Sequence, residues 1–134
     1  MSTDRIALTV PARAEYAKTV RMTASALVSR TGATYDDLDD VRVAAEELFV
    51  YACDHADEED EVVIEFLIGE KDVGMSVRLP QGDRATDDEA EHRAAYATFI
   101  LQSVCDHYEL SSDLDGQYLK VRKRLSAEPD DAGG

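Results

Sequence analysis

The stretch TYDDLDDVRVAAEELFVYACDHA, residues 34–56, carries the clearest structural signal in this chain. Its apolar residues recur at the three- and four-residue steps of a helix. These residues are Leu38, Val41, Ala45, Leu48 and Ala52. Thr34 stands where an N-cap is expected, with Asp37 at the capping-box position. Acids in the first turn suit the positive end of a helix dipole. The stretch therefore predicts one long amphipathic helix.

A polar stripe runs along the same helix. Glu47, Tyr51 and His55 are four residues apart, so a helix carries them on one face. On a helical wheel they border the apolar stripe and do not oppose it. A carboxylate, a phenol and an imidazole in this position form the floor of an active site, the remnant of one, or the polar margin of a buried helix.

Hydrophobic periodicity assigns the remaining elements. In order, they are a strand at 5–10, a helix from Pro11 to about Thr31 ended by Gly32, the helix of 34–56, strands at 62–68 and 73–79, a helix at 93–106, and a hairpin at 107–112 and 117–125. The polar and acidic composition of residues 80–92 predicts a loop. This order predicts an α+β two-layer sandwich, with helices on one face of a mixed, mainly antiparallel sheet. We expect one domain over 1–125 and a disordered acidic tail over 126–134.

The charge balance limits the classes of partner. The 134 residues include 29 acids against 14 Lys and Arg, for a net charge of −15. This disfavours direct binding of nucleic acid, which needs a basic surface, and binding to an anionic membrane. A basic protein partner and adaptation to a saline habitat both account for it. The chain lacks a membrane-spanning run and a signal pattern, so we expect a cytoplasmic protein.

Common catalytic and metal-binding motifs are absent from the sequence. Cys-Asp-His occurs at 53–55 and 105–107, but adjacent helical residues diverge and the usual zinc spacing is missing. Cys53 and Cys105 are better interpreted as small core residues, and no metal is expected. There is no Gly-x-Ser-x-Gly elbow and no Gly-Lys-Ser/Thr phosphate loop.

Three segments carry a resemblance to a known family: PARAEYAKTVRMTASALVSR (11–30), TGATYDDLDDVRVAAEE (31–47) and the final VRKRL (121–125). The chain resembles the RsbW-like anti-sigma-factor serine kinases of bacteria, which belong to the GHKL ATPase superfamily. The likeness is close over about residues 6–79 and remains colinear to Leu125. It implies a Bergerat-type, histidine-kinase-like ATPase fold.

The resemblance also assigns the polar stripe. In the family, the second long helix carries a catalytic Glu, an Asn four residues on that holds Mg²⁺, and often a His-Ala pair. Glu47 matches the base and His55 the histidine, but Tyr51 replaces the asparagine. A neutral phenol on a bulky ring is a poor ligand for Mg²⁺, which prefers small oxygen ligands in octahedral geometry.

Two further nucleotide motifs are altered. The family's Asp-x-Gly, whose Asp binds adenine, aligns with a segment that begins at Pro80 and ends at Gly82, so the acceptor is missing. The family's Gly-rich turn before the third helix aligns with a segment containing Ala94, Ala95 and Ala97. Each added Cβ disfavours positive φ and close approach to phosphates. The resemblance therefore predicts a degenerate nucleotide pocket without a cofactor.

The family's first strand and first helix form its homodimer and contact the sigma factor. Arg21 matches a position that contacts sigma by charge, and Glu15, Tyr16 and Lys18 lie in the same segment. We therefore expect a dimeric, non-enzymatic anti-sigma factor, released by an anti-anti-sigma (STAS) partner or another signal. The alternatives are an active serine kinase that uses ATP and Mg²⁺, a scaffold paired with a kinase paralogue, and a sensor of a ligand other than ATP.

Overall fold

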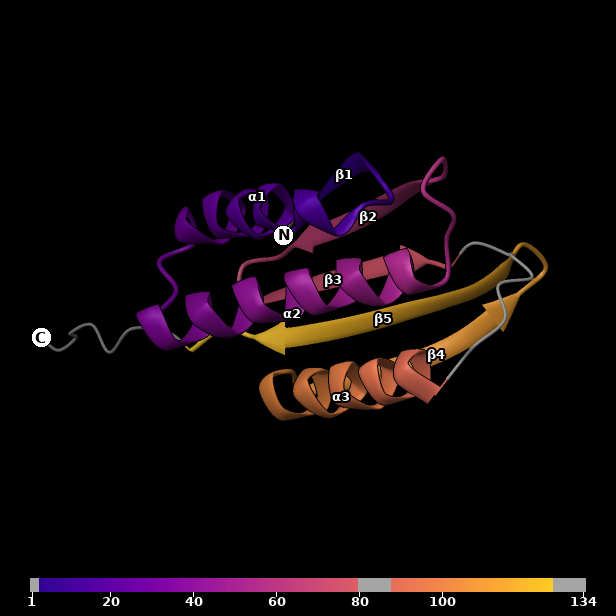
Figure 1. The fold of residues 1–134 in the computed structure, drawn as a ribbon. Coiled ribbons are helices and arrows are strands. Elements are labelled where there is room, and N and C mark those ends of the chain that lie inside the picture. Colours follow the sequence, from indigo (N-terminus) through magenta and orange to yellow (C-terminus); the bar gives the residue numbers. More distant parts are fainter. Residues whose placement is uncertain (1–2, 80–87, 127–134) are drawn as a thin grey trace, which may run out of the picture.

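The computed structural model describes residues 3–79 and 88–126. Within these residues, five strands form one sheet and three α-helices cover one of its faces (Figure 1). The predicted α+β two-layer sandwich is confirmed, as is the predicted order of its elements. Pro80, Gly82 and the acidic tail beyond Ser126 lie outside the described residues.

The sheet has the strand order β1-β2-β3-β5-β4, and every strand pair within it is antiparallel. Its strands are β1 (Asp4–Pro11), β2 (Glu61–Ile68), β3 (Asp72–Arg78), β4 (His107–Asp113) and β5 (Gly116–Arg124). Alternate side chains of the central strands point to the helices and are buried, among them Ile64, Phe66, Met75 and Leu119. The opposite face of the sheet carries no helix among the described elements (Figure 1).

Helix α2 (Tyr35–Asp54) lies between the other two helices (Figure 1). Four residues of its predicted core stripe are fully buried: Val41, Ala45, Leu48 and Ala52. The side chain of Thr34 accepts a hydrogen bond from the Asp37 amide at 3.1 Å, which confirms the predicted N-cap. The carboxylate of Asp37 instead accepts from the amide of Ser126, so it holds the end of β5 against the start of α2.

The predicted helix start at Pro11 is wrong. Pro11 is the last residue of β1, opposite Glu61. The amide of Ala12 then donates to Asp60, which extends the pairing of the two strands. A short 3-10 turn at Ala14–Tyr16 leads into α1 (Ala17–Ser29). Gly32 has φ of 80°, a conformation that favours glycine, and it turns the chain between α1 and α2 as predicted.

Helix α3 (Asp88–Val104) begins five residues before the predicted position 93. Part of the predicted loop at 80–92 is therefore helical, and residues 80–87 lie outside the described residues. Acids favour a helix N-terminus through the dipole, and the first turn holds Asp88, Glu89 and Glu91. Ala97 and Leu101 anchor α3 in the core. No helix in the described ranges combines the length and apolar composition needed to cross a bilayer.

Candidate functional site

A groove of about 410 Å³ lies between α2 and α3. The two helices run antiparallel to one another (Figure 1). The groove, called the α2–α3 groove below, is lined by Glu46, Glu47, Val50, Tyr51, Asp54, His92, Arg93, Tyr96 and Ala97. Two of the three polar-stripe residues, Glu47 and Tyr51, are among them, so the four-residue spacing brings part of the predicted site together.

Glu47 is half-buried at the groove wall. Burial and, secondarily, the neighbouring Glu46 carboxylate raise the pKa of Glu47 above 4.5. No ion pair involving Glu47 occurs among residues 3–79 and 88–126. Its charge is therefore poorly compensated, and the group favours either a proton or a cation from a bound partner.

Tyr51 is only 8% exposed, and its ring packs with the core. Burial, with a smaller effect of Tyr108, raises the pKa of Tyr51 above 10.0, so its hydroxyl stays neutral. The ring stacks on His55, with 4.7 Å between the ring centroids and 27° between the planes. The space beside α2 at this position is thus filled by an aromatic side chain.

His55 is the C-terminal cap of α2 and does not line the groove. Its Nδ1 lies 2.9 Å from the carbonyl oxygen of Tyr51, a contact one helical turn away. This contact and the ring stacking orient the imidazole along α2. The stripe therefore divides into two groove residues and one helix-end residue.

The segment aligned with the family's Gly-rich turn lies inside α3. Ala94, Ala95 and Ala97 are more than one turn beyond Asp88, the first helical residue. Amides at these positions are hydrogen-bonded along the helix and are not available to a ligand. Ala97 is buried at the groove floor, whereas Ala95 is exposed.

Two ion pairs neutralise part of the acidic lining. Arg93 Nε lies 3.1 Å from Asp54 Oδ2, which connects α3 to α2. Arg21 Nη1 lies 2.7 Å from Glu46 Oε1, which connects α1 to α2. With both pairs formed, Glu47 keeps the groove negative. This lining attracts cationic groups and repels anions such as polyphosphates.

The four residues expected at the partner surface separate into two groups. Glu15, Tyr16 and Lys18 lie around a shallow depression of α1 and the preceding turn, together with Met22. The guanidinium of Arg13 sits over the Tyr16 ring, 5.6 Å from its centroid. Arg21 instead points to α2 and is paired with Glu46, so it adjoins the α2–α3 groove.

The two Cys-Asp-His triplets do not meet. Among residues 3–79 and 88–126, no three His, Cys, Asp or Glu side chains gather as metal ligands do. Burial is the main factor that raises the pKa of Cys53 to about 11 and that of Cys105 to about 12. Both thiols therefore remain protonated at neutral pH, and both contact the core.

Several groove residues were not predicted from the sequence. They are Glu46, Val50, Asp54, His92, Arg93 and Tyr96. Those of α2 follow from extending the stripe of Glu47 by three- and four-residue steps. Those of α3 require knowing that the helix begins at Asp88 and lies against α2, and no local pattern contains that information.

The fold agrees with comparisons to known proteins. The family model described as Histidine kinase-like ATPase domain matches residues 10–123. The serine-protein kinases RsbW of Staphylococcus aureus strains JH9 and Newman are each 46% identical over 57 residues, covering 42% of this chain and 36% of the relative. The matched stretch thus spans about a third of the length of those relatives.

One solved structure extends the comparison over most of the chain. The crystal structure of the RsbU and RsbW domains of a Mycobacterium tuberculosis protein has a TM-score of 0.68 and 21% identity, covering 93% of this chain and 33% of that one. At this identity the likeness shows the fold alone. The chain belongs to the histidine kinase-like ATPase domain family, and the predicted RsbW-like resemblance is confirmed.

Proposed function

We propose that this protein is an anti-sigma factor that sequesters a bacterial sigma factor by binding, without using ATP. The observation that carries the proposal is the position of Tyr51. By the family resemblance it matches the Mg²⁺-binding asparagine, and in the structure it is 8% exposed and stacked on His55. A neutral phenol held in this way does not fit the coordination that Mg²⁺ requires.

The charge of the α2–α3 groove supports the same conclusion. Glu46, Glu47 and Asp54 line it, and its arginine is already paired with Asp54. The first turn of α3 adds Asp88 and other acids near one end. A triphosphate there meets carboxylates where it needs cations or backbone amides. The groove lining within residues 3–79 and 88–126 therefore fits Mg²⁺–ATP poorly, which supports the proposal.

The proposed partners follow from the RsbW relatives. A sigma factor is the bound target, an anti-anti-sigma (STAS) protein or another signal releases it, and the chain acts as a homodimer. The α1 surface supports this, because Glu15, Tyr16 and Lys18 remain accessible there beside the exposed Met22. Competition between partners for this surface releases the sigma factor without phosphate transfer.

The test measures binding of the purified chain to each purified sigma factor of its source organism. Calorimetry is run with and without ATP and Mg²⁺. We expect one sigma factor to bind with a Kd of about 1 μM or tighter, and its affinity to be unchanged by nucleotide. Failure of every sigma factor to bind, or binding that requires ATP, contradicts the proposal.

Glu47 favours one second candidate, an active serine-protein kinase. A half-buried carboxylate with a raised pKa at the family's base position has the character of a general base. The chain is incubated with labelled ATP, Mg²⁺ and the STAS proteins of its source organism. Phosphate incorporated into a STAS protein and abolished by Glu47→Gln establishes the kinase; no incorporation by the wild-type chain excludes it.

A further inference from the structure

Three exposed apolar side chains lie on the two helices of the α2–α3 groove: Tyr96 lines the groove, whereas Phe99 on α3 and Val43 on α2 lie outside its lining. Tyr96 and Phe99 are 62% and 66% exposed, and Val43 is 40% exposed. Tyr96 and Phe99 are three residues apart on α3 and therefore share one side of it. Val43 precedes Val50 by two helical turns, so it continues the groove-lining stripe of α2. Large apolar side chains gathered on one surface indicate a place that another molecule covers.

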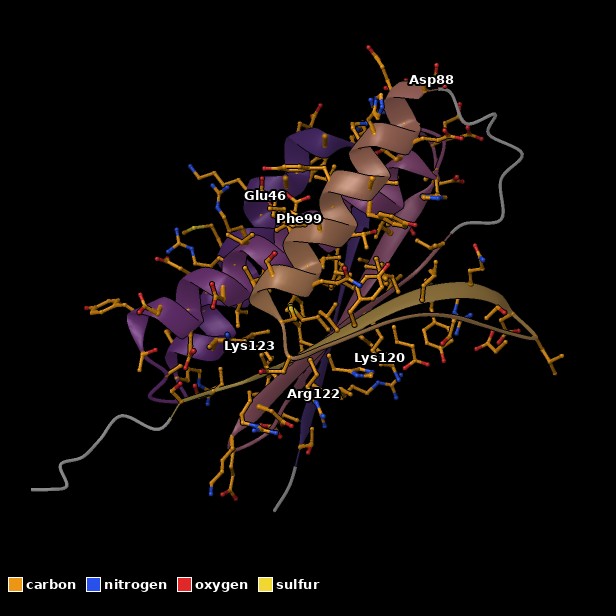
Figure 2. All side chains as sticks on the ribbon, turned by 90° about the horizontal axis from the view of Figure 1, so that it is seen from below. Glu46, Asp88, Phe99, Lys120, Arg122 and Lys123 are labelled. Atoms are coloured by element: carbon orange, nitrogen blue, oxygen red, sulfur yellow. The ribbon has the colours of Figure 1, made fainter. Side chains whose placement is uncertain are left out.

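The ion pair of Arg93 with Asp54 fixes which parts of the two helices lie opposite. Phe99 follows Arg93 on α3 by about 9 Å, and Glu47 precedes Asp54 on α2 by about 10.5 Å, at ~1.5 Å per residue. Because the helices are antiparallel, Phe99 lies level with Glu46 and Glu47. Figure 2 shows Glu46 and Phe99 on these neighbouring stretches. The ring of Tyr96 and the carboxylates of Glu46 and Glu47 therefore line the same groove, and Phe99 lies at the same level on α3.

Negative charges exceed positive charges around these exposed side chains. Arg21 and Arg93 are engaged with Glu46 and Asp54. Glu47 has no ion pair within the described ranges, and the whole chain carries −15. A partner therefore binds more tightly if it places cations next to the carboxylates and apolar groups against the aromatic rings.

We propose that the α2–α3 groove receives an amphipathic helix of a protein partner, with an apolar stripe on Tyr96 and Phe99 and lysines or arginines toward the carboxylates. A groove between two helices, with aromatic anchors on one of them, suits the helix-in-groove mode of recognition. This inference rests on the proposed function, because the sigma factor is the partner that supplies the helix.

Other occupants fit the charges less well. A second copy of this chain, also at −15, is repelled by the acidic lining of the groove, whereas the proposed homodimer forms through the first strand and first helix, outside the groove. A nucleic acid meets the same repulsion. A basic amphipathic helix covers the exposed rings with its apolar stripe and pairs its cations with the uncompensated Glu47. It is therefore the occupant that the charges favour.

The first experiment uses a synthetic helical peptide as the probe. It carries leucines at helical spacing flanked by lysines and a fluorescent label, and its binding is followed by anisotropy. A second peptide replaces the lysines with glutamates, and a third scrambles the order. We expect only the first to bind tightly. Equal binding of the ordered and scrambled basic peptides overturns the inference, because it reveals general attraction to an acidic chain.

Variants of exposed residues then locate the site. Tyr96→Ala and Phe99→Ala are each expected to weaken peptide binding by about tenfold or more, as truncated aromatic anchors do. Leu114→Ala, at the exposed tip of the β4–β5 hairpin, is the matched control and leaves binding unchanged. Glu47→Gln weakens it less, and that loss disappears in high salt. Unchanged binding by Phe99→Ala and Tyr96→Ala overturns the inference.

Two further measurements separate the alternatives. Light scattering reports whether Phe99→Ala alters the oligomeric state; dissociation of a dimer assigns the groove to a second copy and overturns the inference. Sigma binding is measured for the wild type and Phe99→Ala. Equal binding overturns the groove inference while the proposed function stands. If the wild type binds no sigma factor, the proposed function fails and the peptide comparison alone decides the inference.

Discussion

Arg21 on α1 donates a hydrogen bond from Nη1 to Oε1 of Glu46 on α2, with 2.7 Å between the two atoms. This pair connects the helix expected to contact a sigma factor with the lining of the α2–α3 groove. A partner that contacts Arg21 by charge therefore competes with Glu46 for the same guanidinium. The outer surface of α1 and the α2–α3 groove are therefore adjacent, and one partner can contact both.

The Arg21–Glu46 pair has a measurable effect on stability. Both side chains are about one-third exposed, at 33% and 34%, so solvent screens their attraction. We expect a coupling of about 0.5–1 kcal/mol in a double-mutant cycle of the two alanine variants, measured by urea unfolding. The more exposed Arg42–Asp39 pair serves as a control with a smaller coupling. Additive effects of Arg21→Ala and Glu46→Ala contradict the prediction.

Arg21 also provides a direct test of the sigma contact that the family resemblance predicts. We expect Arg21→Ala to weaken the affinity by about tenfold or more, as loss of an arginine hot spot does. Arg122→Ala is the control: it lies on the face of the sheet opposite the helices (Figure 2) and is exposed. Equal losses in both variants indicate general electrostatic attraction. An unchanged affinity for Arg21→Ala removes this residue from the interface.

Restoring an asparagine at position 51 is not expected to restore nucleotide binding. Tyr51→Asn supplies one Mg²⁺ ligand but leaves the acidic groove and the helical Ala94 and Ala95 in place. It also leaves a cavity where the buried ring stood, at a cost of about 3 kcal/mol or more. Calorimetry with millimolar ATP and Mg²⁺ should show no binding by either the wild type or the variant. Micromolar affinity in either protein refutes the prediction.

The structural features that could be predicted from the sequence are those set by residues close together along the chain. The cap at Thr34 and the buried stripe of α2 follow from spacing within one helix, and both were predicted correctly. The start of α3 was not, because Asp88, Glu89 and Glu91 suit either a solvated loop or a helix N-terminus. The helix is favoured over the loop only because the apolar residues that follow, such as Ala97 and Leu101, pack into the core.

The candidate site shows the same division. Glu47 and Tyr51 were found because their four-residue spacing is visible in the sequence. The pairs Arg21–Glu46 and Arg93–Asp54 join residues far apart along the chain and depend on how the helices pack. The exposed Phe99 was not predicted as a surface residue. An apolar residue in a helix is assigned to the core by default, until it is known which face of the helix packs against the sheet.

The helix cap at Thr34 yields a stability prediction. Its Oγ1 accepts from the Asp37 amide at 3.1 Å, and alanine leaves that donor without a side-chain acceptor. We expect Thr34→Ala to lower the free energy of unfolding by about 1 kcal/mol. Thr23→Ala is the matched control, because its hydroxyl bonds back to Thr19 within α1; its effect is within about 0.5 kcal/mol. Urea titration distinguishes the two, and equal effects contradict the assignment.

The two cysteines are expected to react slowly in the folded protein. With pKa values of about 11 for Cys53 and about 12 for Cys105, little thiolate is present in mildly alkaline buffer. Alkylation should be at least about a hundredfold slower than for an ordinary exposed thiol. Mass spectrometry after timed iodoacetamide treatment measures each site, and unfolding in urea should restore the normal rate. Rapid labelling of either cysteine in the native chain is inconsistent with its burial.

Adjacent carboxylates on α2 are expected to respond oppositely to neutralisation. Burial, followed by the effect of Glu46, raises the pKa of Glu47 above its ordinary value of 4.5. The folded state therefore binds a proton at Glu47 more tightly than the unfolded state does. This stabilising contribution is complete below pH 4.5 and is lost as the pH rises through the folded-state pKa. At neutral pH the ionised Glu47 thus costs stability.

Glu47→Gln should consequently raise the Tm at neutral pH, with the gain over the wild type shrinking as the pH falls toward 4.5. Glu46→Gln is the neighbouring control, and it should lower the Tm at neutral pH because it breaks the 2.7 Å pair with Arg21. Thermal unfolding of the three proteins across this pH range measures both effects. A lower Tm for Glu47→Gln at neutral pH shows that an attractive partner outweighs the cost of burial. The groove then has a compensated charge, which also removes the electrostatic reason for it to attract a basic helix.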